Sequence, residues 1–164
     1  MKIVSGGQTG VDRAALDAAL GLGVEAGGWC PEGRRAEDGF IPEKYPVKVL
    51  PKAGYRQRTK RNVVDSDGTV IIFFASPAGG TQQTLEFCVK ESKPYVLINA
   101  EELSVVQASE KIRQFIDKNN ISTLNVAGPR ASEKAEAYGY ANMVILTVIH
   151  ESTEFIAIFE NAGI

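Results

Sequence analysis

Two glycine-rich turns, each lying between an apolar strand pattern and a helix pattern, constrain the fold of this chain most. The first turn, S-G-G-Q-T-G, follows a strand predicted over residues 2–5 and opens a helix predicted over 11–22. The second, S-P-A-G-G-T, follows the apolar run T-V-I-I-F-F and opens a helix predicted over 81–92. Apolar strands that alternate with helices are typical of a parallel sheet covered on both faces.

The rest of the chain continues this alternation. Further strands are predicted over 24–29, 47–50, 94–98 and 122–127, and further helices over 55–65 and 105–118. From residue 132 onward the chain is rich in β-branched residues, but its apolar residues share one helical face, so we expect a helix. The loop 30–46 has no clear period, yet its apolar anchors favour an ordered structure. We therefore expect one α/β domain over residues 1–164, with a doubly wound, mostly parallel sheet.

The order of the strands predicts where a ligand would bind. In a doubly wound sheet, right-handed crossovers would place the first strand beside the T-V-I-I-F-F strand. The two glycine turns would then meet at the topological switch point, where open α/β sheets bind their ligands.

Both turns have the features of an anion site. Glycine lets the backbone approach a ligand closely, and the first N–H groups of a helix, here those near residues 9–12, carry a partial positive charge. The candidate ligand-binding residues on the turns are Gly6, Gly7, Gln8, Thr9, Gly10, Gly79, Gly80, Thr81 and Thr84. Asp12 fits a capping box and is expected to be structural, since its carboxylate would repel an anion. Neither turn matches a dinucleotide fingerprint or a P-loop.

Two arginines outside the turns are candidates to hold an anion, because a guanidinium can donate two parallel hydrogen bonds to phosphate or carboxylate. Arg58 shares a helical face with Tyr55 and Arg61, and Arg34 lies in the long loop. The alternative for Arg58 is a solvated basic face. Glu86 is either a general base or ribose-hydroxyl acceptor, or simply an exposed helix residue.

Charge and residue usage argue against several classes of function. The net charge of −2 gives no reason to expect a nucleic-acid or membrane partner, and the longest apolar runs are far too short to span a membrane. A single histidine, His150, and two cysteines outside any metal-binding spacing predict no metal site. Cys88 is expected in the core, whereas Cys30 could face a ligand. With no signal-peptide pattern, we expect a cytoplasmic protein with reduced thiols.

On these residues the chain resembles the molybdenum cofactor carrier proteins. The stretches that carry the resemblance are G-G-Q-T-G-V-D-R-A-A-L-D, G-W-C-P-E-G-R-R-A-E-D-G, Y-R-Q-R-T-K-R-N with S-D-G-T, G-G-T-Q-Q-T and L-N-V-A-G-P-R. They span most of residues 1–130. The resemblance implies a cytoplasmic, oligomeric protein with a Rossmann-like fold that binds a pterin phosphate cofactor without transforming it.

A wider resemblance is to the lysine-decarboxylase-like phosphoribohydrolases, which cleave the base from a nucleoside monophosphate. Those enzymes have a basic helix, an S-D strand and a P-G-G-x-G-T-x-x-E turn, and the resemblance implies Arg58 and Glu86 as catalytic residues. The turn in this chain reads P-A-G-G-T-Q-Q-T-L-E, with an extra residue and without the third glycine.

The sequence therefore leaves two functions open. The first is a binding or carrier protein whose phosphorylated ligand lies on both turns, with Arg58 as a clamp, the 29–39 loop as a cover and Trp29 as a stacking surface. The second is an N-glycoside hydrolase in which Glu86 activates water and Arg58 orients the phosphate. Neither function requires a further cofactor. The ligand could be a pterin, a purine nucleotide or an oxyanion such as molybdate, and an apolar helix over Tyr138–Phe159 could join two subunits of a homo-oligomer.

Overall fold

The computed structural model of the chain describes the backbone of residues 1–161 and the side chains of residues 1–151. Within these residues a central sheet of five strands has the order β2-β1-β9-β7-β8, and every pairing in it is parallel. The strands are β1 (Lys2–Val4), β2 (Glu25–Gly27), β7 (Gly68–Phe73), β8 (Tyr95–Asn99) and β9 (Thr123–Ala127). The helices are α1 (Val11–Gly21), α2 (Tyr55–Val64), α3 (Gly79–Lys90), α4 (Val105–Asn119) and α5 (Ala137–Asn161).

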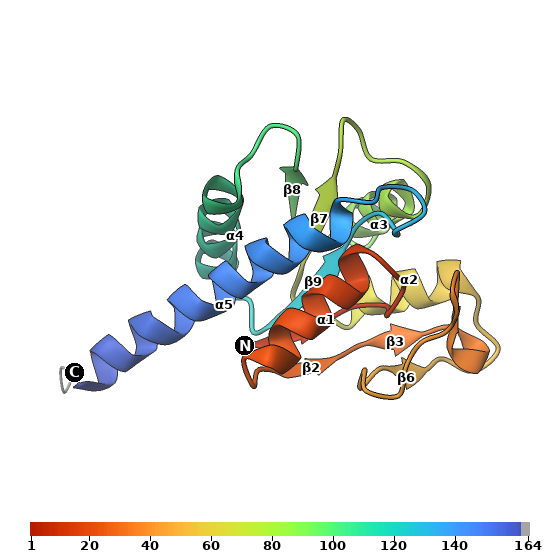
Figure 1. Cartoon of the computed structure of the whole chain (residues 1–164), viewed down its shortest axis with the longest axis horizontal. Coiled ribbons are helices and arrows are strands. Elements are labelled where there is room, and N and C mark those ends of the chain that lie inside the picture. Colours follow the sequence, from red (N-terminus) through yellow and green to blue (C-terminus); the bar gives the residue numbers. More distant parts are fainter. Residues whose placement is uncertain (162–164) are drawn as a thin grey trace.

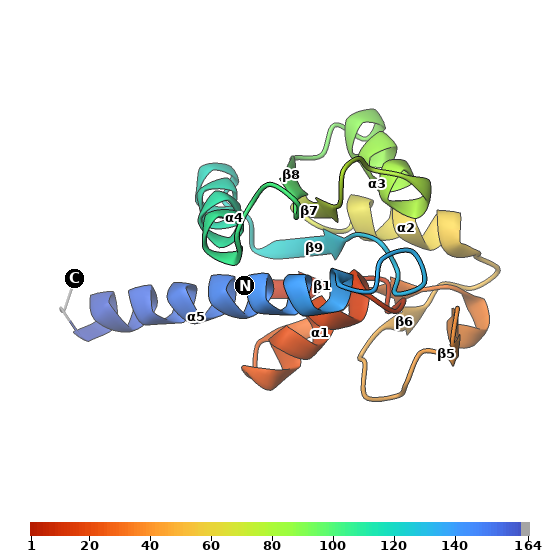
Figure 2. The same ribbon diagram turned by 45° about the horizontal axis from the view of Figure 1, so that its top comes forward.

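Helices cover both faces of the sheet, as the apolar strands predicted. The alternating side chains of β7 show the two faces, because Val70 and Ile72 pack in one apolar cluster and Ile71 in another. The larger cluster joins the sheet to α1, α4 and α5, and the smaller one joins it to α2 and α3. Figures 1 and 2 show α1 beside α5, with α2 and α3 on the opposite side. The Rossmann-like α/β fold is thus confirmed.

The predicted neighbour of β1 is wrong. β9 lies between β1 and β7 and pairs with both, so the first strand does not contact the T-V-I-I-F-F strand. The order becomes familiar when the strands are counted from β9, because the sheet then reads 3-2-1-4-5, as in a doubly wound fold. The last strand of the chain thus takes the central place of the first, and the switch point falls between β9 and β7.

The loop 30–46 is ordered, as expected. The predicted strand over 24–29 splits at Gly28 into β2 and β3 (Trp29–Cys30), and β3 pairs with the predicted edge strand β6 (Lys48–Val49). Between them lie a 3-10 turn, η1 (Glu32–Arg34), and a hairpin of β4 (Arg35–Ala36) and β5 (Gly39–Phe40). An apolar cluster supports this segment from beneath: Leu16, Cys30, Ala36, Ile41, Tyr45 and Val47. Cys30 is thus fully buried, as is Cys88 in the core.

Polar contacts fasten the same loop to α1. Arg13 donates two hydrogen bonds to the carboxylate of Asp38, at 2.6 and 2.8 Å. One helical turn later, Asp17 accepts hydrogen bonds from Lys44 at 2.8 Å, from Tyr45 at 2.9 Å and from Tyr138 of α5 at 2.8 Å. Asp17 therefore ties three segments together that are distant in sequence.

We expect Asp17→Asn to weaken the acid sensitivity of the fold. Burial alone would raise the pKa of Asp17, but the hydrogen bonds from Lys44, Tyr138 and Tyr45 outweigh it, and the pKa is lowered. A carboxylate with a lowered pKa stabilises the fold above its unfolded pKa of about 3.9, and this contribution is lost as the pH falls through the folded pKa. Urea unfolding between pH 2.5 and 7 should therefore show a flatter acid limb for Asp17→Asn, at lower stability near pH 7. Asp117→Asn on α4 is the control, and equal slopes for wild type and Asp17→Asn would contradict the prediction.

The C-terminal segment forms the predicted helix, α5. Up to residue 151, where the described side chains end, its buried residues are those of the predicted face: Ala137, Ala141, Val144, Ile145, Val148 and Ile149. The proposed subunit contact over Tyr138–Phe159 lies partly outside the described side chains. No helix in the described part of the chain is long and apolar enough to cross a membrane.

Candidate functional site

A pocket of about 300 Å³ opens at the carboxyl ends of β9 and β7, at the switch point of the sheet. This volume is at the lower end of the range for small-molecule sites, roughly 300–1,000 Å³. Both glycine turns contribute to the wall, and the end of β9 lies between them. The lining residues are Gly6, Gln8, Asp12, Tyr55, Arg58, Thr59, Asn62, Gly79, Gly80, Thr81, Gln83, Thr84, Asn125, Val126, Ala127, Gly128, Arg130 and Glu133.

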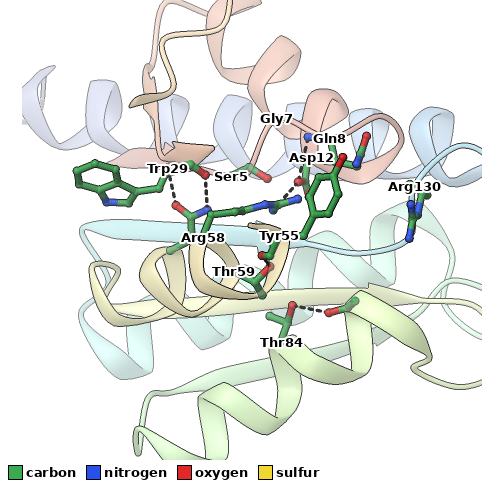
Figure 3. Close-up of polar contacts among 12 residues, drawn as sticks. Ser5, Gly7, Gln8, Asp12, Trp29, Tyr55, Arg58, Thr59, Thr84 and Arg130 are labelled. Carbon is green, nitrogen blue, oxygen red and sulfur yellow. Dashed lines mark hydrogen bonds and ion pairs between the residues drawn. The ribbon is translucent and has the colours of Figure 1, made fainter. Parts of the chain in front are cut away.

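Arg58 is the most deeply placed cation of the pocket. Its side chain is only 12% exposed, and Nη1 donates a hydrogen bond to Oδ2 of Asp12 at 3.1 Å (Figure 3). Its Nε is buried and has no hydrogen-bond partner among the described residues. A buried donor without a partner costs about 1–3 kcal/mol. Gly6 makes room for this arrangement, because a Cβ there would overlap the guanidinium.

Asp12 holds Arg58 from the first turn of α1. Its Oδ2 also accepts a hydrogen bond from the N–H of Gln8 at 3.2 Å. Burial raises the pKa of the Asp12 carboxyl, against the charge of Arg58, which lowers it. The predicted capping box of Asp12 with Thr9 is wrong, because the helix begins after Gly10 and no side chain caps it. Asp12 is instead structural through its contacts with Gln8 and Arg58, and it orients the guanidinium beside the pocket.

The N-terminus of α3 is open toward the pocket. No side chain caps this helix end, and nothing in the described structure pairs with the N–H groups of Gly79 and Gly80. A Cβ at Gly80 would meet no atom within 4 Å, so the backbone is accessible there. Unpaired amides at a helix N-terminus favour an anion.

The N-terminus of α1 differs from our expectation. We expected free N–H groups near residues 9–12, and this is wrong for Thr9 and Val11. The Thr9 amide donates to Oε1 of Gln8 at 3.0 Å, and the Val11 amide to the carbonyl of Pro129 at 3.2 Å. The segment after β9 covers this helix end so closely that a Cβ at Gly10 would overlap its backbone. Its position follows from the unexpected place of β9.

The remaining residues of the first turn contact the protein. Gly7, with φ +77°, lies against Ile41 and accepts a hydrogen bond from Arg13 at 3.0 Å. The hydroxyl of Thr9 donates to Glu37 and accepts from the Ala131 amide. Of the five residues predicted on this turn, Gly6 and Gln8 line the pocket.

Three side chains that we considered as ligand contacts lie outside the pocket wall. Arg34 donates to the carbonyls of Ile41, Pro42, Tyr45 and Val47, which fixes the loop. Trp29 donates from its indole to Asp65, and Arg61 packs over its ring. Glu86 is exposed and accepts a hydrogen bond from Gln82 at 3.3 Å. The structure therefore does not bring Glu86 and Arg58 together.

Several pocket residues were missed by our interpretation of the sequence. The end of β9, Asn125–Gly128, forms part of the wall, and Arg130 and Glu133 lie just beyond it. Arg130 pairs with Glu133 at 3.0 Å and lies 3.8 Å from Glu37. The L-N-V-A-G-P-R stretch was a usable signal, but its role depends on β9 being central. Arg58 and Arg130 face two carboxylates, Asp12 and Glu133, so the lining is close to neutral.

The fold and pocket define a Rossmann-like α/β protein with a pocket at the switch point of a reordered sheet. The chain belongs to the circularly permutated YpsA SLOG family, whose sequence model matches residues 3–149. It is also similar to a protein of known crystal structure from Syntrophus aciditrophicus SB, named "Putative molybdenum carrier protein". The two are 41% identical, with a TM-score of 0.88, and the match covers 90% of this chain and 93% of the other. No curated protein gives a significant match.

Proposed function

We propose that this protein binds a small phosphorylated molecule in the switch-point pocket and acts as a binding or carrier protein. The molybdenum pterin cofactor is a candidate cargo, because the similar protein is named for a molybdenum carrier and the pterin cofactor bears a phosphate. A purine nucleotide meets the same requirement for an anionic group.

The observation that carries the proposal is that Arg58 and the open N-terminus of α3 line the same pocket. An anion between them would receive hydrogen bonds from a guanidinium and from unpaired backbone amides. Such a ligand could also satisfy Nε of Arg58 after a small side-chain movement, offsetting the cost of leaving that donor buried. The near-neutral lining favours a ligand with one compact anionic group over a polyanion.

The size of the pocket supports an organic ligand. Its volume of about 300 Å³ greatly exceeds the roughly 30 Å³ that one water molecule occupies. A bare oxyanion such as molybdate would occupy a small part of this space and leave the far wall solvated. A phosphate attached to a ring system would fill it better.

The hydrolase alternative has less support. In the P-G-G-x-G-T-x-x-E motif the glutamate follows the threonine by three residues, and in this chain that position holds Thr84. The Thr84 hydroxyl donates to the carbonyl of Gly80 at 3.0 Å. The two carboxylates that line the pocket, Asp12 and Glu133, are each paired with an arginine.

Gly80→Asp should test the anion site without harming the fold. A carboxylate in the first turn of α3 would favour the helix N-terminus, contributing about 0.3–1 kcal/mol, but would repel an anion there. We expect the melting temperature to hold or rise, while binding of AMP and inorganic phosphate, measured by calorimetry, falls at least about tenfold.

Val106→Asp is the matched control, because it adds a carboxylate to the first turn of α4, at an exposed position outside the pocket. It should keep the affinity of the wild type. If Gly80→Asp bound AMP and phosphate as tightly as the wild type, the N-terminus of α3 would not be part of the anion site. Release of free adenine from AMP, detected by chromatography, would instead favour the N-glycoside hydrolase.

A further inference from the structure

The proposed anion site makes no use of the aromatic side chain in the pocket lining, Tyr55. Tyr55 is the first residue of α2, and the same helical face presents Arg58, Thr59 and Asn62 to the pocket. The residue is 43% exposed. In Figure 3 the Tyr55 ring stands beside the Arg58–Asp12 pair. An aromatic ring therefore shares the pocket with its most deeply placed cation.

The Tyr55 ring has no stacking partner among the described residues, and no other aromatic ring lines the pocket. Within the described residues no aromatic ring or cation packs on it, and it is the one aromatic side chain in the pocket lining. The rest of the wall is built mainly of glycines and of polar or small side chains. Trp29, our earlier candidate for stacking, packs against Arg61 outside the pocket.

The geometry points to Tyr55 as the residue that selects the ligand, by stacking on a planar heterocycle that carries the anionic group. This inference rests on the proposed function, because the anion at Arg58 and α3 brings the heterocycle next to the tyrosine. Aromatic side chains stack on flat heterocycles, usually with an offset, and remove the two contacting faces from water. The pocket would thereby discriminate a phosphorylated heterocycle from a phosphorylated sugar, although both bear the same anion.

The test compares ligands that share the phosphate and differ in the ring. Calorimetry would measure the binding of AMP, riboflavin 5′-phosphate and ribose 5-phosphate to the wild type and to Tyr55→Leu and Tyr55→Phe. We expect the wild type to prefer at least one ring compound over ribose 5-phosphate. Tyr55→Leu should reduce that preference roughly 5- to 150-fold, the range of base–aromatic stacking, without changing the affinity for ribose 5-phosphate. Tyr55→Phe should retain the preference.

Tyr95→Leu serves as the control, since Tyr95 is an exposed tyrosine on β8 outside the pocket. The inference is overturned if the wild type binds neither ring compound more tightly than ribose 5-phosphate. It is equally overturned if Tyr55→Leu keeps the preference, or lowers the affinity for all three compounds alike. If the wild type binds none of them and no inorganic phosphate, the proposed function itself fails, which is a distinct result.

Discussion

Replacing Arg58 with methionine should reduce the affinity for AMP by about 10- to 150-fold. A hydrogen bond to a charged group contributes about 1.5–3 kcal/mol, and each 1.4 kcal/mol corresponds to a factor of ten. The same change leaves Asp12 buried beside the pocket without its cation. Breaking one side of a buried ion pair costs about 3–5 kcal/mol of stability, so the single variant should also melt early.

The double variant Asp12→Asn/Arg58→Met separates these two effects. It removes the unpaired carboxylate, so we expect stability to recover toward that of the wild type while ligand affinity stays low. Arg56→Met is the control, because Arg56 lies on the same helix but packs over Phe87 outside the pocket. Full AMP affinity in the stable double variant, measured by calorimetry, would contradict the role of Arg58.

Gly28→Ala should destabilise the fold by about 2–6 kcal/mol. Gly28 has φ +124°, a conformation that costs another residue about 1–3 kcal/mol. A Cβ there would also overlap the carbonyl oxygen of Ser5, the residue that follows β1, and overpacking typically costs a further 1–3 kcal/mol. The total is a large part of the 5–15 kcal/mol that stabilises an ordinary domain.

The matched control for this prediction is Gly139→Ala in α5. A Cβ at Gly139 would meet no atom within 4 Å, so this variant should be as stable as the wild type or gain up to about 1 kcal/mol. Urea unfolding followed by circular dichroism measures both changes. If Gly28→Ala and the wild type had the same urea midpoint, the prediction would be wrong, and the backbone of Ser5 would be able to move away from the added Cβ at little cost.

The elements of the fold could be predicted because their signals are local. The apolar run of β7, the glycine turns and the helical face of α5 each depend on residues close together in sequence. The place of β9 could not be predicted in this way. Its sequence, T-L-N-V-A, is apolar enough for any buried strand, and only contacts with both β1 and β7 decide that it is central.

The same limit explains the errors at the candidate site. Residues of both glycine turns reach one pocket, as expected, but the expected reason was wrong, because β9 lies between the two strands that precede the turns. The covering of the α1 terminus by residue 129 and its neighbours depends on where β9 ends, which is not a local property. Likewise, Arg34 and Arg58 look equivalent in the sequence. The guanidinium of Arg34 donates its hydrogen bonds to four carbonyls of the folded loop. Arg58 instead reaches the pocket, because the glycine at position 6 leaves room for its guanidinium.

The late position of β9 in the chain has a consequence for folding on the ribosome. β1 pairs with β2, and β7 with β8, but these two pairs hydrogen-bond to each other only through β9. Until residues 123–127 have left the ribosome, no strand can join these two pairs, and β1 and β7 each lack one of their neighbours. Without these residues the sheet lacks its central strand, and the switch-point pocket lacks the part of its wall that Asn125–Gly128 forms.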